Sequence, residues 1–229
     1  LEEIRALCDA ATILRLGKKV GECTPREVTA AHMAELMVGK SLSAPARDAQ
    51  EPGEVLLHVA GLSVTPASPF GTPLRHVGLE VRAGEVLGIG GVAGNGQDEL
   101  LAALSGETTV APGAITLKGE PVGALGPNAR RALGLLCAPE ERLGHAAAPD
   151  MSLTENAVLT ARIRQGLDRS GFVDWSKAKG FAEEIIARFD VRTPGPGVAA
   201  RALSGGNLQK YVIGREILQN PTVLVVNQP

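Results

Sequence analysis

Apolar side chains recur at helical or strand spacing through the first forty residues. Ile4, Leu7 and Cys8 share one face of a helix predicted within residues 1–10. Residues 12–16 and 19–23 predict a β-hairpin around the turn at Gly17 and Lys18. The sequence therefore opens with a small helical and hairpin unit.

A second helix is predicted from Thr24 to Gly39. Thr24 suits the N-cap, Pro25 the first helical position, and Glu27 completes a capping box. Met33, Leu36 and Met37 recur at helical spacing and are expected in the core. Residues 40–53 carry Pro45, Pro52 and almost no large apolar side chain, and this composition predicts a linker.

A second unit begins at Glu54 with a strand pattern. Residues 55–59 and 74–81 predict two strands, with prolines and a glycine marking the loop between them. Residues 85–90 predict a short apolar strand that runs into a glycine-rich segment, 91–98. Leu100, Leu101 and Leu104 then supply one face of a helix. A strand, a glycine loop and a helix in this order form the context of a phosphate-binding loop.

The rest of the chain predicts further alternation of strands and helices. Residues 114–117 and 133–137 predict strands, and Asp174 can cap a helix with Phe181, Ile185 and Phe189 on one face. The segment 203–210, Leu-Ser-Gly-Gly-Asn-Leu-Gln-Lys, is a polar turn that opens into a helix. Ser204 is a good N-cap, and Gly205 and Gly206 allow close backbone approach, so this helix start could hold an anion. Residues 222–226 close the chain as a buried strand.

Composition narrows the function classes. At 229 residues and 44% hydrophobic content, the chain can bury a real core in one or two domains. A net charge of -2 and 3% aromatic residues argue against nucleic acid as a partner. Cys8, Cys23 and Cys137 lack paired metal-ligand spacing, which favours a reducing compartment over a disulfide or zinc framework. No run approaches the roughly 18 apolar residues of a membrane span, and the start is acidic where a signal peptide is basic.

These motifs, in this order, resemble the ABC ATPase domain over residues 54–229. The loop with Gly91, Gly94, Asn95, Gly96, Gln97 and Asp98 looks like a Walker A motif, and Glu140 stands at the place of the Q-loop glutamine. Ser204, Gly205, Gly206 and Asn207 match the ABC signature, and residues 223–228 look like Walker B. The resemblance implies an α/β fold, with a P-loop ABC ATPase core, an antiparallel β subdomain and a helical signature subdomain at about 150–205.

The resemblance is strongest to the second domain of tandem importers for simple sugars and nucleosides. It implies that residues 1–39 are the tail of a preceding ABC domain, that 40–53 link it to the second, and that 54–229 are an incomplete second domain, truncated on its C-terminal side. We expect residues 1–39 to dock against the strand at 222–226, in cis or in a neighbouring molecule. The implied cofactors are ATP and Mg²⁺. The implied partners are permease subunits and the other ABC domain, at the inner face of the cell membrane.

The departures from the family motif bear on chemistry. A working Walker A loop ends in Lys and Ser or Thr, but Gln97 and Asp98 stand here. Asn227 and Gln228 replace the Walker B aspartate and the catalytic glutamate, so Gln228 marks a degenerate catalytic position and Asp98 with Asn227 a weak magnesium position. The sequence predicts a weak or silent site with an intact signature. The alternative is a non-enzymatic module of the same fold that docks on a permease without using nucleotide.

Overall fold

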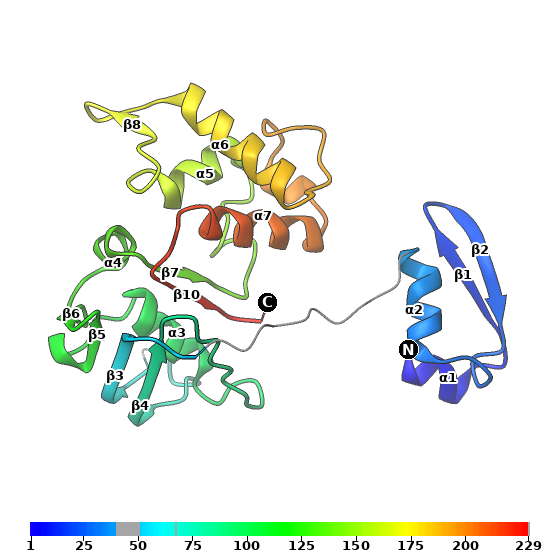
Figure 1. The fold of residues 1–229 in the computed structure, drawn as a ribbon, viewed down its shortest axis with the longest axis horizontal. Helices are drawn as coiled ribbons and strands as arrows, with labels where there is room; N and C mark the ends of the chain where they lie inside the picture. The colour runs from blue at the N-terminus through cyan, green and yellow to red at the C-terminus, as the bar shows by residue number, and fades with distance from the viewer. Residues whose placement is uncertain (40–50, 67, 229) are drawn as a thin grey trace. The chain divides into compact units, whose positions relative to one another are not determined.

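The computed structural model describes residues 1–39, 51–66 and 68–228, and the chain divides into two compact units, Leu1–Ala49 and Gln50–Pro229. Each unit is considered by itself (Figure 1). Most of the expected linker, residues 40–50, lies outside the described residues. The assignment of residues 1–39 to a preceding domain, and their docking, remain predictions.

The first unit is a hairpin packed against a helix. Its elements are α1 (Glu2–Leu7), β1 (Ala11–Arg15), β2 (Lys18–Cys23) and α2 (Ala30–Val38). The two strands pair antiparallel, from Ala11 opposite Cys23 to Arg15 opposite Lys18. The hairpin predicted from the sequence is therefore confirmed, with strand ends within one residue of those expected. Ile13 of β1 and Met33 of α2 are buried.

Two predictions for α2 are wrong. The helix begins at Ala30 rather than after Thr24, because Thr29 accepts a hydrogen bond from the His32 amide at 3.1 Å and takes the N-cap. Residues 24–27 form a turn instead. Met37 is 50% exposed, so it does not belong to the core with Met33. Gly39 ends the helix as predicted, in the left-handed conformation.

The second unit opens with an antiparallel sheet. Its strand order is β4-β3-β5-β6, and its elements are β3 (Val55–Val64), β4 (Leu74–Arg82), the 3₁₀-helix η1 (Pro112–Ala114), β5 (Ile115–Leu117) and β6 (Glu120–Pro121). Helix α3 (Gln97–Ser105) packs Leu104 against the buried Leu57 and Ile115 of this sheet. The antiparallel sheet is therefore one wall of a hydrophobic core in this unit, called the first core below, which includes Leu57, Leu104 and Ile115.

A parallel strand pair forms the other wall of this core. Helix α4 (Pro127–Leu133) leads into β7 (Leu135–Ala138), which pairs with β10 (Val223–Val226) from Val223 opposite Leu135 to Val226 opposite Ala138. Leu135 and Val223 contact the same core cluster as α3. The carboxyl ends of both strands therefore lie at one edge, beside the residues that follow them.

The strand predicted at residues 85–90 is absent from the structure. The segment has no strand assignment, and its Val86 side chain is 76% exposed. A cavity of about 260 Å³ is lined by this segment on one side and by β10 on the other. Since strands form only where backbone groups find a hydrogen-bonded neighbour, a segment without one in the described residues stays irregular.

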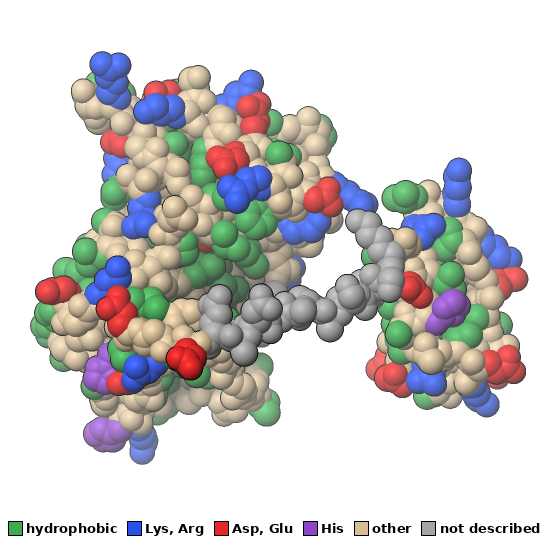
Figure 2. Space-filling view, viewed as in Figure 1, with side chains coloured by type: hydrophobic (Ala, Val, Ile, Leu, Met, Phe, Trp, Pro, Cys, Tyr) green, Lys and Arg blue, Asp and Glu red, His purple; other side chains and the backbone are tan. Residues whose placement is uncertain are grey.

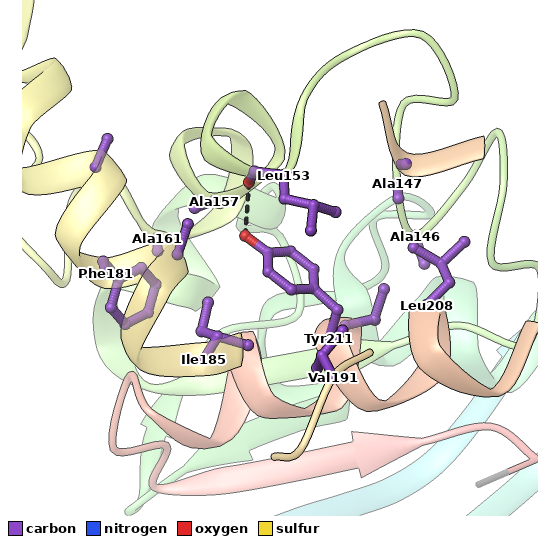
Figure 3. Packing of buried hydrophobic residues seen from close by; sticks show 14 of the residues in the cluster. Ala146, Ala147, Leu153, Ala157, Ala161, Phe181, Ile185, Val191, Leu208 and Tyr211 are labelled. Carbon is purple, nitrogen blue, oxygen red and sulfur yellow. Dashed lines mark hydrogen bonds between the residues drawn. The ribbon is translucent and has the colours of Figure 1, made fainter. Parts of the chain in front are cut away.

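The remaining elements form a helical layer above β7 and β10 in the view of Figure 1. They are α5 (Leu153–Ala161), β8 (Asp168–Arg169), β9 (Phe172–Val173), α6 (Trp175–Arg188), the 3₁₀-helix η2 (Ala200–Ala202) and α7 (Gly205–Ile217). Asp174 caps α6 as predicted, by accepting from the Lys177 amide at 3.1 Å. Figure 3 shows Tyr211 of α7 reaching between α5 and α6, where its hydroxyl donates to the Leu153 carbonyl at 2.6 Å. The Tyr211 hydroxyl is thus a buried polar group with a hydrogen-bond partner inside the core of the helical layer.

A buried charge cluster joins the helical layer to the first core. Glu216 of α7 is fully buried, and its carboxylate accepts from Arg131 of α4 at 2.6 Å and from Arg215 at 2.9 Å. Thr160 of α5 donates to the same carboxylate at 3.0 Å. Arg215, also buried, donates to the carbonyl oxygens of Asn156 and Ala146. Burial by itself raises the pKa of Glu216, but the charges and hydrogen bonds of Arg215 and Arg131 outweigh it and lower this pKa.

We predict that Glu216→Ala lowers the free energy of unfolding by about 3–5 kcal/mol, because it leaves two arginines facing a buried gap. Denaturant unfolding measures this. Glu183→Ala is the matched control, since the Glu183–Lys179 pair is exposed and its loss should cost less than about 0.5 kcal/mol. Equal effects of the two substitutions would contradict the role given to Glu216.

The same cluster predicts a pH dependence. Since the folded pKa of Glu216 is lowered, its contribution is fully present above the ordinary value of 4.5 and is lost as pH falls through the folded value. The stability of a Glu216→Gln chain should therefore fall less steeply with acid than that of the wild type below pH 4.5. Parallel curves would show that other groups control acid unfolding.

Candidate functional site

The glycine-rich segment before α3 forms a tight loop. Gly94 and Gly96 have positive φ angles of 84° and 102°, and Gly96 is the N-cap of α3. A side chain at Gly96 would place its Cβ 2.9 Å from Leu74 Cδ2. Both positions therefore require glycine, one for its backbone angle and the other for its angle and its close contact.

The loop is cross-linked from within by its own side chains. Gln97 Oε1 accepts from the Asn95 amide at 2.9 Å, and Gln97 Nε2 donates to the Val92 carbonyl at 3.0 Å. Asn95 Nδ2 donates to the same carbonyl at 3.0 Å. The side chain at the Walker lysine position is therefore bonded to the loop itself.

The proline-rich loop between β3 and β4 holds the same segment from outside. Thr72 Oγ1 donates to the Gly94 carbonyl at 2.7 Å, and the Thr72 amide donates to Glu99 Oε1 at 2.9 Å. Phe70, the aromatic side chain nearest in sequence, is 96% exposed. Sequence reasoning missed Thr72 and Glu99, because neither belongs to a motif and 27 residues separate them.

Asp98, which departs from the Walker A motif, contacts Asn227, which departs from the Walker B motif. Asn227 Nδ2 donates to Asp98 Oδ1 at 3.3 Å. Gln228, the next residue, has a positive φ of 49°, and its backbone carbonyl accepts from Gln209 Nε2 of α7 at 3.3 Å. The acidic group of this pair thus lies in the first turn of α3, and the amide directly follows β10.

A cavity of about 690 Å³ opens beside this pair. Four of the predicted site residues line it: Asp98, Glu140, Gly205 and Asn227. The other predicted residues, Gly91 to Gln97 together with Ser204, Gly206, Asn207 and Gln228, do not line it. Glu107 and His145 also line the cavity, and Glu107 Oε1 lies 2.9 Å from His145 Nε2, a hydrogen-bonded contact that no sequence motif indicates.

Residues 204–207, called the signature turn below, lie at the start of α7. Ser204 is its N-cap, as predicted, although its side chain makes no capping bond. Its Oγ accepts instead from Asn207 Nδ2 at 2.9 Å, and Asn207 Oδ1 accepts from the Arg192 amide at 2.9 Å. A Cβ on Gly205 would lie 2.9 Å from Arg142 Nη1, so the arginine covers this glycine. Ser204, Gly205 and Gly206 remain exposed to solvent.

Four acidic residues line the cavity, Asp98, Glu107, Glu140 and Glu141, and Asp98 among them is hydrogen-bonded to the carboxamide of Asn227. Mg²⁺ usually binds one or two protein carboxylates together with phosphate oxygens, so Asp98 and Asn227 are candidate ligands for such an ion. Within the part of the chain that the structure describes, no group of three or more His, Cys, Asp or Glu side chains could hold a metal by itself. Burial raises the pKa of Cys137, on β7, to about 12, so this thiol stays protonated and is not a nucleophile.

Surface charge is mixed. Acidic and basic side chains are interspersed over the face that Figure 2 shows. None of the helices in residues 1–39, 51–66 and 68–228 is long and apolar enough to cross a membrane.

Comparison with known proteins identifies the family to which the chain belongs. Residues 74–229 match the family model described as ABC transporter. The chain belongs to the ABC transporter family. Its α/β fold is therefore that of an ABC ATPase cassette, as the glycine loop, the parallel strands and the signature turn indicated.

Curated relatives carry the same segment within longer chains. The chain is 36% identical to the nucleoside import ATP-binding protein NupA of Lactococcus lactis, over 100% of this chain and 45% of that protein. It is 36% identical to the guanosine import ATP-binding protein NupO of Bacillus subtilis, over 97% and 44%. It is 38% identical to the ribose import ATP-binding protein RbsA 2 of Streptomyces coelicolor, over 100% and 43%. The chain thus spans less than half the length of these relatives.

Solved structures agree on the fold. A dimeric ATP-binding cassette in a post-hydrolysis state, bound to ADP and Pi, matches with a TM-score of 0.60 and 19% identity, over 76% of this chain and 74% of that one. A nucleotide-free cassette from an ABC transporter matches with a TM-score of 0.56 and 18% identity, over 77% and 70%. At this identity the likeness concerns the fold alone.

We predict that Gly96→Ala destabilises the chain by about 2–3 kcal/mol, from backbone strain together with the contact to Leu74. Gly119→Ala is the matched control, since Gly119 has a positive φ of 82° but open space around it, and should cost about 1 kcal/mol. Denaturant midpoints of the two variants measure the difference. A smaller loss for Gly96→Ala than for Gly119→Ala would contradict the packing described.

Proposed function

We propose that this chain is the second ATP-binding segment of a tandem importer protein for simple sugars or nucleosides. Its own Walker A and B residues form a weak or silent nucleotide site. Its signature turn completes the site of the other ABC domain. The relatives, whose names refer to nucleoside, guanosine and ribose import, support this class of transported solute.

The observation that carries the proposal is the pairing of Asp98 with Asn227 at the cavity. A lost unit charge about 4 Å from a phosphate is worth about 4 kcal/mol in a surface-like dielectric. Favourable charge at a helix N-terminus is worth about 0.3–1 kcal/mol. The glycine loop therefore cannot replace the missing lysine, and Asp98 repels phosphate unless Mg²⁺ lies between them.

In this proposal, the site formed by the chain's own Walker A and B residues also lacks a group that could catalyse hydrolysis. Gln228 stands where the family places its catalytic glutamate, and a carboxamide can orient water but cannot accept its proton at neutral pH. Asn227 likewise contributes a neutral oxygen where an aspartate would attract Mg²⁺. The site can hold a nucleotide weakly, with Asp98 and Asn227 facing the cation, and lacks a base for hydrolysis.

The signature turn keeps the groups that its role requires. Ser204 and Gly206 are exposed, and α7 starts directly behind them, so the positive end of a helix of 13 residues faces outward. In the family, each site is built from the Walker A loop of one domain and the signature of the other. We assign Ser204, Gly205, Gly206 and Asn207 to a nucleotide held by the other domain. The implied location is the inner face of the membrane, against permease subunits.

The second candidate function is that of a non-enzymatic module that does not use nucleotide. The bonds of Gln97 to Asn95 and Val92 favour it, because they satisfy the loop without any ligand. Such a module would dock on a permease through the same fold.

We predict opposite effects of two substitutions on ATP hydrolysis by the full-length tandem protein. Ser204→Arg should reduce turnover at least about tenfold, because it places a cation and bulk in the exposed signature turn that faces the working site. Gln228→Ala should leave turnover nearly unchanged, because Gln228 belongs to the silent site. Steady-state phosphate release measures both. The reverse pattern would refute the assignment, and no effect of Ser204→Arg would favour the module without nucleotide.

A second prediction concerns the loop itself. Gln97→Lys together with Asp98→Ser restores a positive charge and a magnesium-binding hydroxyl, so ATP affinity should rise about tenfold or more. Calorimetry with Mg²⁺ and ATP on the 229-residue chain measures the gain. No gain would show that the loop does not receive phosphate.

A further inference from the structure

The bonds inside the glycine loop use groups that a phosphate would need. In a phosphate-binding loop, backbone N–H groups point at the anion and donate to its oxygens. Here the Asn95 amide donates to Gln97 Oε1 at 2.9 Å instead. The carboxamide oxygen therefore acts on this amide as a phosphate oxygen would.

The other end of the carboxamide completes the cross-link. Gln97 Nε2 donates to the Val92 carbonyl, which also accepts from Asn95 Nδ2. A lysine at this position has no acceptor and could not make the bond to the Asn95 amide. A carboxamide, with one acceptor and two donors, satisfies both sides of the loop.

The loop is shaped to admit this side chain. A Cβ on Gly91 would lie 2.8 Å from Gln97 Nε2. The φ angle of Gly91 is not in the left-handed region, so its backbone does not demand glycine. The room that Gly91 leaves is taken by the carboxamide, and Thr72 and Glu99 brace the segment from outside.

We propose that Gln97 is an internal occupant of the phosphate loop. It holds the loop in shape without nucleotide, and an anion binds only after displacing the carboxamide. This inference rests on the proposed function, in which the loop is the phosphate end of a weak nucleotide site.

The first test is amide hydrogen exchange at Asn95 in the full chain, without nucleotide. Gln97→Ala removes the acceptor, so exchange should be about two- to tenfold faster than in the wild type. Gly91→Ala keeps Gln97 but pushes its carboxamide out, and should accelerate exchange in the same way. Gln165→Ala is the matched control, since it deletes a glutamine bonded to the Leu218 carbonyl outside the loop. Unchanged exchange in both loop variants would overturn the proposal.

The second test separates an occupant from a simple scaffold. Tripolyphosphate affinity, measured by calorimetry, should be about three- to tenfold higher for Gln97→Ala than for the wild type, because the competing acceptor is gone. A scaffold residue would give faster exchange with lower or equal affinity, and that result would overturn the proposal. If even Gln97→Lys with Asp98→Ser binds no tripolyphosphate, the nucleotide site of the proposed function fails, while Asn95 exchange still decides whether Gln97 holds the loop.

Discussion

The buried carboxylate of Glu216 is the constraint on which the arrangement of the Gln50–Pro229 unit depends. An unpaired charge at this position would cost several kcal/mol, so Arg131 of α4, Arg215 of α7 and Thr160 of α5 must meet there. That requirement fixes the register of α7 against the first core. Since α7 is a rigid helix about 20 Å long, fixing its last turn also fixes the signature turn at its first. The candidate site is thus positioned by a charge cluster that takes no part in its chemistry.

The candidate site combines the fold of an ABC cassette with altered motif residues. In the proposed function, Gln97, Asn227 and Gln228 are amides at positions where the family has charged groups that hold and cleave a nucleotide. Gln97 turns inward, and Asn227 turns toward Asp98. Each amide finds a partner within the chain, so the loop and the strand end are satisfied without nucleotide. In the proposed function, such a domain completes the site of the other domain and contributes little turnover of its own.

Most of the helices and strands could be predicted from the sequence, because they depend on local patterns. The hairpin at β1 and β2, the cap at Asp174 and the helix behind Ser204 follow from turn residues and periodicity. The failures have non-local causes. Residues 85–90 have the composition of a strand but pair with no strand among the residues that the structure describes. Thr29 rather than Thr24 is the N-cap of α2. The contacts that shape the site, Thr72 with Gly94 and Asn227 with Asp98, join segments 22 and 129 residues apart, so no local pattern contains them.

The claim that this site lacks catalytic chemistry is tested most directly by single-turnover hydrolysis. The 229-residue chain is mixed in large excess with labelled ATP and Mg²⁺. The excess of protein ensures that weak ATP binding does not limit the observed rate of hydrolysis. We expect no phosphate release above the rate in buffer, because neither Asn227 nor Gln228 can act as a base. Phosphate release by the chain that disappears in Gln228→Ala would contradict this account.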